Sequence, residues 1–197
     1  MNKEREMKSA VKKFETTVNT VYENGKILVM GEGGLDSLVM LVGEAPGEQE
    51  TMQKRPFVGK AGKNLDSFLH ETGLNRDKLY ITNTVKFRPT KVNEKTARVS
   101  NRPPSREEIA LCLPFLREEM RIVAPKVVVT LGNVALRAVS GNPKATIGTL
   151  HGAMVPGAPV ELFALYHPAS VIYNRSLAET YMEDLGTLRR TLEQVLD

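Results

Sequence analysis

The chain has 197 residues, of which 41% are hydrophobic and 25% charged, a composition that excludes disordered and fibrous proteins. This length fits a single domain spanning residues 1–197. No run approaches the roughly 20 apolar residues of a membrane helix, and the charged start lacks a signal-peptide core, so we expect a cytoplasmic protein that binds no membrane. The net charge of +4 weakly favours an anionic partner.

Taken in chain order, hydrophobic patterns predict helices and short buried strands that alternate. The helices fall at 2–18, within an N-terminal helical segment 1–20, and at 61–71, 105–123, 133–140 and 177–196. The strands fall at 38–42, 79–82, 127–131 and 162–165, with a possible extra edge strand at 27–30 before the glycine turn 31–34. Ser105 and Glu108 have capping-box spacing. We therefore expect an α/β fold, a three-layer α/β/α sandwich around a mostly parallel four-stranded sheet.

The segment 86–106 is strongly basic, with seven lysines and arginines and one acid, Glu94, for a net charge of +6. Its prolines and its lack of apolar periodicity predict a long exposed loop. Such a loop is either a solvated surface segment or an arm that contacts nucleic acid phosphates and releases their counterions. The candidate DNA contacts in it are Lys86, Arg88, Arg98 and Arg102.

Functional side chains are expected where the strands end, because ligands of parallel sheets bind outside the carboxyl ends of the strands. The motif GEAPG follows the first strand at residues 43–47, Asn83 follows the second and His167 follows the last. The motif lacks the Gly-Lys-Ser/Thr of a phosphate loop and the spacing of a dinucleotide fingerprint. Its glycines instead allow the backbone to approach a ligand closely. These strand ends are predicted to bring a carboxylate, an amide and an imidazole to one rim.

Several motifs together resemble those of the family 4 uracil-DNA glycosylases. They are GEAPGEQE at 43–50, RPFVGKAG at 55–62, MGEG at 30–33, ITNTVK at 81–86 with Arg88-Pro89 after it, and His167-Pro168. They occur in the family's order from about residue 16 onward. The resemblance implies an enzyme that hydrolyses the N-glycosidic bond of uracil flipped out of DNA and leaves an abasic site. Uracil-containing DNA is the implied partner, and no protein partner can be inferred.

The resemblance also implies roles for individual residues. The Phe57 ring stacks on the flipped base, and the Asn83 amide offers a donor and an acceptor that distinguish uracil from cytosine. His167, as a neutral imidazole, donates to uracil O2 as negative charge develops there. The loop residues Gly43, Ala45, Pro46 and Gly47 contribute to substrate binding.

The residue that orients the attacking water is left open. The best-known uracil glycosylases have an aspartate where this chain has Ala45, so either Glu44 or Glu50 is the candidate, with Glu44 preferred. Glu50 alternatively excludes the 5-methyl group of thymine. The segment 168–173 is expected to hold the wedge that fills the gap left by the base, or else simply to start a helix. Ser170 and Arg175 are predicted to contact phosphates.

The resemblance fails at the cysteines. Family 4 enzymes hold a four-iron cluster with four cysteines, whose counterparts here fall near Thr16 and Asn19 and at Phe87 and Cys112. Since Cys112 is the only cysteine of the chain, four thiolate ligands are not available and we expect no metal and no cofactor. Phe87 is predicted to act as an apolar plug packed against Cys112, Leu113 and the N-terminal helix.

Three functions remain open at this point. The leading prediction is a uracil-DNA glycosylase of the DNA repair class. The alternatives are a non-catalytic nucleic-acid-binding protein on the same fold, and a glycosylase for another deaminated base such as hypoxanthine or xanthine. The joint presence of Glu44, Phe57, Asn83 and His167 favours catalysis.

Overall fold

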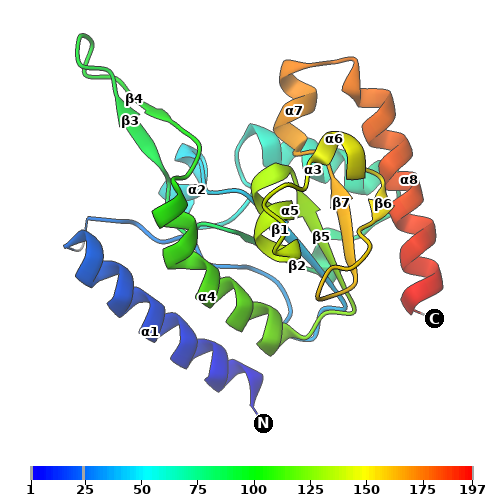
Figure 1. Cartoon of the computed structure of the whole chain (residues 1–197), viewed down its shortest axis with the longest axis horizontal. Coiled ribbons are helices and arrows are strands. Elements are labelled where there is room, and N and C mark those ends of the chain that lie inside the picture. The colour runs from blue at the N-terminus through cyan, green and yellow to red at the C-terminus, as the bar shows by residue number, and fades with distance from the viewer. Residues whose placement is uncertain (1, 24, 197) are drawn as a thin grey trace.

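A five-stranded sheet forms the centre of the computed structural model, which describes residues 2–23 and 25–196 (Figure 1). Residues 1, 24 and 197 of the predicted domain lie outside the described residues. The strands are ordered β2 (Leu79–Asn83), β1 (Val39–Gly43), β5 (Val127–Leu131), β7 (Leu162–Leu165) and β6 (Ala153–Met154). The first four are parallel, and every residue in them is buried. Continuous apolar runs are typical of such doubly covered strands, so the four predicted strands are confirmed.

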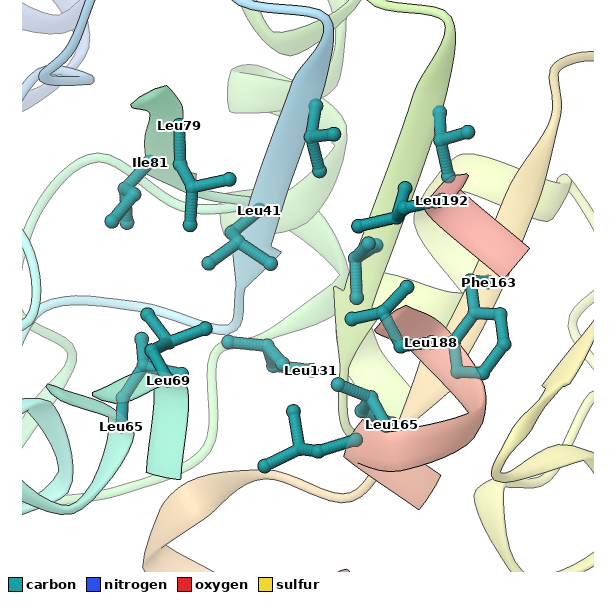
Figure 2. Packing of buried hydrophobic residues seen from close by; sticks show 14 of the residues in the cluster. Leu41, Leu65, Leu69, Leu79, Ile81, Leu131, Phe163, Leu165, Leu188 and Leu192 are labelled. Carbon is teal, nitrogen blue, oxygen red and sulfur yellow. The ribbon is translucent and has the colours of Figure 1, made fainter. Parts of the chain in front are cut away.

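Helices cover both faces of this sheet, which confirms the predicted three-layer sandwich. On one face α3 (Lys60–Glu71) and α8 (Leu177–Leu196) pack against the strands. Figure 2 shows Leu65 and Leu69 of α3, and Leu188 and Leu192 of α8, around the strand leucines. The other face is covered by α4 (Arg106–Val123), α5 (Asn133–Ser140) and α6 (Ile147–Leu150). No helix of the described residues is long and apolar enough to cross a membrane.

The N-terminal helix α1 (Lys3–Tyr22) lies outside this sandwich and packs on α4 (Figure 1). Asn2 caps it, because the Asn2 side chain accepts hydrogen bonds from the backbone amides of Glu4 and Arg5. The helix continues four residues beyond the predicted end at residue 18. The capping box predicted for α4 is confirmed, since Ser105 and Glu108 bond reciprocally at 3.2 Å and 2.8 Å.

The predicted edge strand at 27–30 is wrong. This segment makes one isolated bridge, between Leu28 and Phe87, and Glu32 just after it makes another with Ile81. The pairings do not continue into a ladder, and the chain approaches the start of β2 closely at Gly33. A Cβ atom on Gly33 would lie 2.2 Å from the Leu79 carbonyl oxygen. The fifth strand is instead β6 at the opposite edge, antiparallel to β7, and its two residues are too few to show a period.

The prediction that the basic segment 86–106 is a loop is partly wrong, because the segment contains a β-hairpin. β3 (Thr90–Val92) and β4 (Val99–Asn101) pair antiparallel, and the hairpin projects from the body of the molecule (Figure 1). The Asn93 side chain closes its turn by accepting from the amides of Lys95 and Thr96. Both faces of the hairpin are largely exposed, so these short strands have no buried side and no apolar alternation.

Two of the remaining short helices follow strands and so begin at the carboxyl end of the sheet. α2 (Glu48–Gln53) follows β1, and α7 (Pro168–Tyr173) follows β7. A 3-10 turn, Arg76–Lys78, leads into β2. The hairpin and α7 lie at the same end of the molecule as the carboxyl ends of the parallel strands (Figure 1). These strand ends therefore lie between the hairpin and α7.

Candidate active site

A cavity of about 510 Å³ lies at the carboxyl ends of the strands. It brings together residues from three strand ends, from the 55–62 motif, from the hairpin and from α7. A larger cavity of about 720 Å³ lies near residues 34–39 and the end of α8, and none of the predicted site residues line it. The residues lining the strand-end cavity are Ala45, Gly47, Glu48, Gln49, Glu50, Phe57, Gly59, Lys60, Ala61, Asn83, Asn101, His167, Ala169, Ile172 and Tyr173.

The Phe57 ring forms one wall of this cavity. Its centroid lies 5.9 Å from that of the His167 ring, and the two planes are tilted by 30°. The Phe57 backbone has a φ of +53°, in the left-handed region that non-glycine residues seldom adopt. Arg76 holds this turn from behind, donating to the Phe57 carbonyl at 3.3 Å and to the Pro56 carbonyl at 3.0 Å. Its guanidinium is fixed in turn by Asp66 at 2.6 Å.

Asn83 ends β2 and is only 3% exposed. Its Oδ1 atom and the Cζ atom of Phe57 would each lie 2.5 Å from a Cβ atom on Gly43. Glycine at residue 43 is therefore what allows the amide and the ring to approach the end of β1 together. The backbone next to Asn83 is tied to the same strand, since the Thr84 amide donates to the Gly43 carbonyl at 2.8 Å.

His167 is held as a neutral imidazole. Its Nδ1 atom accepts a hydrogen bond from the Ala169 amide at 3.2 Å, so the ring proton is on Nε2. Burial lowers the pKa of His167 to about 4, although the nearby Glu50 carboxylate acts in the opposite direction. At neutral pH the ring is thus uncharged and has one N–H group, on Nε2, to donate.

Glu50 joins the two loops that frame the cavity. One carboxylate oxygen accepts from the Gly47 amide at 3.1 Å, and the other accepts from the amides of Val58 at 3.1 Å and Gly59 at 2.7 Å. The residue is 9% exposed. Because both oxygens already accept backbone hydrogen bonds, the geometry gives Glu50 a positioning role and does not favour it as the residue that orients water.

Only part of the 43–47 motif lines the cavity. Gly43, Glu44 and Pro46 do not line the cavity, whereas Ala45 and Gly47 do. Glu44 is half-buried, and this burial raises the pKa of its carboxyl group. Its backbone carbonyl accepts from the Val85 amide at 3.0 Å. A carboxyl group whose pKa is raised by burial is common at functional sites.

The prediction that Lys86 contacts DNA is wrong. The Lys86 side chain is fully buried and ion-paired with Glu119, whose side chain is equally buried. Its ammonium group also donates to Thr82 Oγ1 at 2.6 Å and to the Asn83 carbonyl at 2.5 Å. A lysine is costly to bury without a partner, and these partners account for its position.

The other predicted DNA contacts differ in their exposure. Arg102 makes a bidentate ion pair with Glu108, both distances being 2.7 Å, and Arg88 donates to Asn101 and Glu48. Both guanidinium groups are therefore already engaged within the protein. Arg98 lies exposed on the hairpin, and Arg175 lies exposed after α7. Ser170 is half-buried on α7 and does not line the cavity.

The structure adds one cavity residue that the sequence motifs did not indicate. Asn101 at the end of β4 lines the cavity together with Phe57, Asn83 and His167. It lies in a segment without hydrophobic periodicity, eighteen residues after Asn83. The only signal was its place within the basic segment, which does not by itself distinguish it from its neighbours.

The region of the cluster ligands is filled by apolar side chains. Phe87 and Cys112 are fully buried, and they pack with Phe14 and Val18 of α1. The predicted plug is confirmed except at Leu113, which packs with the core on the sheet's other face. Thr16 and Asn19, the predicted counterparts of the first two ligands, instead lie exposed on α1.

These residues do not fit an iron–sulfur cluster. Burial raises the pKa of the Cys112 thiol to about 11, so this single sulfur stays protonated, whereas cluster ligands are thiolates. The described residues contain no group of three or more His, Cys, Asp or Glu side chains that could hold a metal ion. We derive no chemistry from a cluster.

Comparison with known proteins agrees with this arrangement. Residues 30–186 match the family model described as the uracil DNA glycosylase superfamily. The chain is 37% identical over 168 residues to the Type-4 uracil-DNA glycosylase of Pyrobaculum aerophilum, covering 82% of this chain and 81% of that one. It is 36% identical over 172 residues to the Type-4 uracil-DNA glycosylase of Thermotoga maritima, covering 86% and 85%. It is also 37% identical over 171 residues to a Type-5 uracil-DNA glycosylase of P. aerophilum, covering 78% and 71%. The chain belongs to the uracil DNA glycosylase superfamily.

Proposed function

We propose that the chain is a uracil-DNA glycosylase, which hydrolyses the bond between uracil N1 and deoxyribose C1′ and leaves an abasic site in DNA. The observation that carries this proposal is the meeting of the Phe57 ring, the Asn83 amide and the His167 imidazole in one cavity. An aromatic face, a paired donor and acceptor, and a neutral N–H donor are what a flipped uracil requires. The enzyme is proposed to act in the cytoplasm, where it meets DNA.

The base is recognised by its stacking face and its polar edge. Phe57 stacks on the ring, and Asn83 accepts from N3–H and donates to O4 of uracil. Cytosine inverts this pattern, so the NH₂ group of Asn83 would face the amino group of cytosine, which is also a donor. The tight packing of Asn83 and Phe57 against Gly43 keeps the amide from turning aside to accommodate the wrong base.

Bond cleavage moves the C1′–N1 electron pair onto uracil, where O2 gains negative charge, and leaves a cationic sugar. The Nε2–H group of His167 donates to O2 and stabilises the departing anion. A water molecule then adds to C1′ and loses a proton, giving the abasic sugar. Glu44 is proposed to orient that water through its carboxylate, while Glu50 holds the two framing loops in register.

The gap left by the flipped base is proposed to be filled from α7. Ile172 and Tyr173 line the cavity and are 39% and 89% exposed, and exposed apolar side chains can insert between bases as wedges. Ser170 and Arg175 flank them and are proposed to contact the adjoining phosphates. Arg98, on the hairpin, is proposed to bind the DNA backbone farther away.

The test is excision from a uracil-containing oligonucleotide, read as strand breakage after alkali treatment. Asn83→Ala and His167→Ala should each lower the excision rate by about 10²–10³-fold, because each removes a preorganised hydrogen bond to the base. Their affinity for undamaged DNA should be unchanged. Asn133→Ala is the matched control, since that asparagine also follows a strand but bonds to the Ile147 amide outside the cavity.

Arg98→Ala should have the opposite effect, lowering affinity for any DNA while leaving the chemical step intact. A wild-type protein that binds DNA but releases no uracil would contradict the proposal and support the non-catalytic alternative. Release of hypoxanthine or xanthine without release of uracil would instead support a glycosylase for another deaminated base.

A further inference from the structure

The basic hairpin contributes a side chain to the base cavity. Asn101 ends β4, is paired in register with Thr90 of β3, and is exposed. It lines the same cavity as Phe57 and His167. Its Nδ2 atom lies 3.6 Å from the position of a Cβ atom on Gly47. The base of the hairpin is therefore part of the cavity wall, while its tip reaches away from the molecule.

The orientation of the Asn101 amide is set before any ligand binds. Arg88 Nε donates to Asn101 Oδ1 at 2.7 Å, and Arg88 Nη1 is held by Glu48 at 3.2 Å. A guanidinium group has only donors, so the amide oxygen must face Arg88 and the amide NH₂ group must face away from it. The cavity wall next to Gly47 is thus supplied with a fixed donor. Arg88, which we predicted to touch DNA, acts here as a positioning residue.

The group that the Asn101 NH₂ donor binds can be inferred from the acceptors of the flipped nucleotide that the other residues leave without a partner. Asn83 and His167 account for O4, N3–H and O2 of uracil, so the remaining acceptors of the flipped nucleotide belong to the sugar and the phosphates. A donor against the sugar ring oxygen would oppose the positive charge that develops there. A phosphate oxygen carries negative charge and gains from a donor at every stage of the reaction.

We infer that Asn101 donates a hydrogen bond from Nδ2 to a non-bridging oxygen of a phosphodiester adjoining the flipped nucleotide. This inference rests on the proposed function and goes beyond the roles given above to the base-binding residues. It connects two parts of the molecule, because the hairpin that carries the exposed basic residues Lys91, Lys95 and Arg98 also carries the cavity donor. Binding of the DNA backbone by the hairpin thereby places a phosphate contact at the base cavity.

The experiment compares Asn101→Ala and Asn101→Asp with the wild type on single-uracil oligonucleotides under single-turnover conditions. Asn101→Ala loses the hydrogen bond to the charged phosphate. Its rate of uracil excision at subsaturating enzyme should therefore fall by about 10- to 100-fold. Asn101→Asp should lose more, because its carboxylate repels the phosphate. Inhibition by free uracil should be unchanged in both, since the base contacts remain. Ser100→Ala, on the same strand but outside the cavity lining, is the matched control and should excise uracil at the wild-type rate.

The contacted phosphate is identified with uncharged methylphosphonate linkages placed one at a time on either side of the uracil nucleotide. At the contacted linkage the difference between the wild type and Asn101→Ala should shrink, and at the other linkages it should persist. Arg88→Lys should lower the rate when it is introduced into the wild type. Introduced into Asn101→Ala it should cause little further loss, because Arg88 acts by orienting Asn101.

Three results would overturn the inference. They are a wild-type rate in Asn101→Ala, a difference that persists at every methylphosphonate position, and weaker inhibition by free uracil in Asn101→Ala. If the wild type releases no uracil, the proposed function itself fails. Binding to DNA that carries a tetrahydrofuran abasic analogue then still tests Asn101. A loss of affinity for that DNA, beyond any loss for undamaged DNA, would support the phosphate contact, and equal affinities would refute it.

Discussion

Replacing Lys86 with methionine tests whether its charge serves the interior of the protein or DNA. The Lys86 ammonium group pairs with Glu119, and neither side chain has any exposed surface. Glu119 also accepts from the hydroxyl groups of Tyr80 and Thr82, each at 3.2 Å. Methionine keeps most of the volume of the lysine stem but removes the charge, so the buried carboxylate of Glu119 is left with two neutral donors.

The expected loss of folding stability is that of removing one partner of a buried ion pair. Such changes destabilise proteins by about 3–5 kcal/mol, because one charge stays buried without its partner. In a domain of this size about 1 kcal/mol corresponds to 2–4 °C in Tm, so Lys86→Met should lower Tm by roughly 6–20 °C. The double variant Lys86→Met/Glu119→Gln removes the second charge as well and should recover much of the loss.

The measurements are urea unfolding, thermal unfolding and the salt dependence of binding to undamaged DNA. Well below its Tm, Lys86→Met should bind DNA with the same slope of log affinity against log salt concentration as the wild type. Arg98→Ala should reduce that slope by about one contact. A stable Lys86→Met protein that binds DNA more weakly and with a shallower slope would refute the buried pair and restore the surface role predicted from the sequence.

Two further predictions concern the chemical step and the stacking ring. Because burial raises the pKa of Glu44 above its ordinary 4.5, kcat/KM should fall as the pH drops through that raised pKa and the carboxylate gains a proton. Glu44→Gln should remove this limb and leave a slower profile that changes only near pH 4, where His167 titrates; a fall at the same pH as in the wild type would contradict the role of Glu44. Arg76→Met should free the Phe57 turn and raise KM for uracil-containing DNA by about tenfold, since two hydrogen bonds to the Pro56 and Phe57 carbonyls are lost. Arg76→Lys should restore part of the loss, whereas an unchanged KM in Arg76→Met would show that packing alone holds the ring.

The parts of the fold that the sequence predicts are those that repeat a pattern over many residues. β1, β2, β5 and β7 are continuous apolar runs because both faces of the sheet are covered, and their ends locate Asn83 and His167. The hairpin has no such pattern, since its two three-residue strands are mostly exposed. Asn101 reaches the cavity only through that hairpin, so its role depends on a tertiary arrangement that local sequence does not record.

The largest error at a single residue concerns Lys86. Its place in the basic segment 86–106 predicts a DNA contact, but its ion-pair partner Glu119 lies 33 residues away on α4 and holds it in the interior. Counting along the chain gives Thr16 and Asn19 as the counterparts of two ligands, while the helical phase of α1 directs Phe14 and Val18 to the core. Counting gives a position along the sequence, whereas the direction of a side chain follows from which face of its element is buried.

The packing beyond the end of β2 explains how the candidate site is positioned without an iron–sulfur cluster. Phe87 lies four residues beyond Asn83 and is fully buried against Cys112 and α1, so the chain leaving the strand is anchored by apolar packing. The Phe14 and Phe115 rings stack in the same cluster with centroids 4.5 Å apart, which joins α1 to α4 without a shared metal. Lys86, between the strand end and this plug, bonds directly to the Asn83 carbonyl. The backbone of Asn83, whose amide is proposed to read uracil, is therefore held by a buried ion pair and an apolar plug, neither of which requires iron.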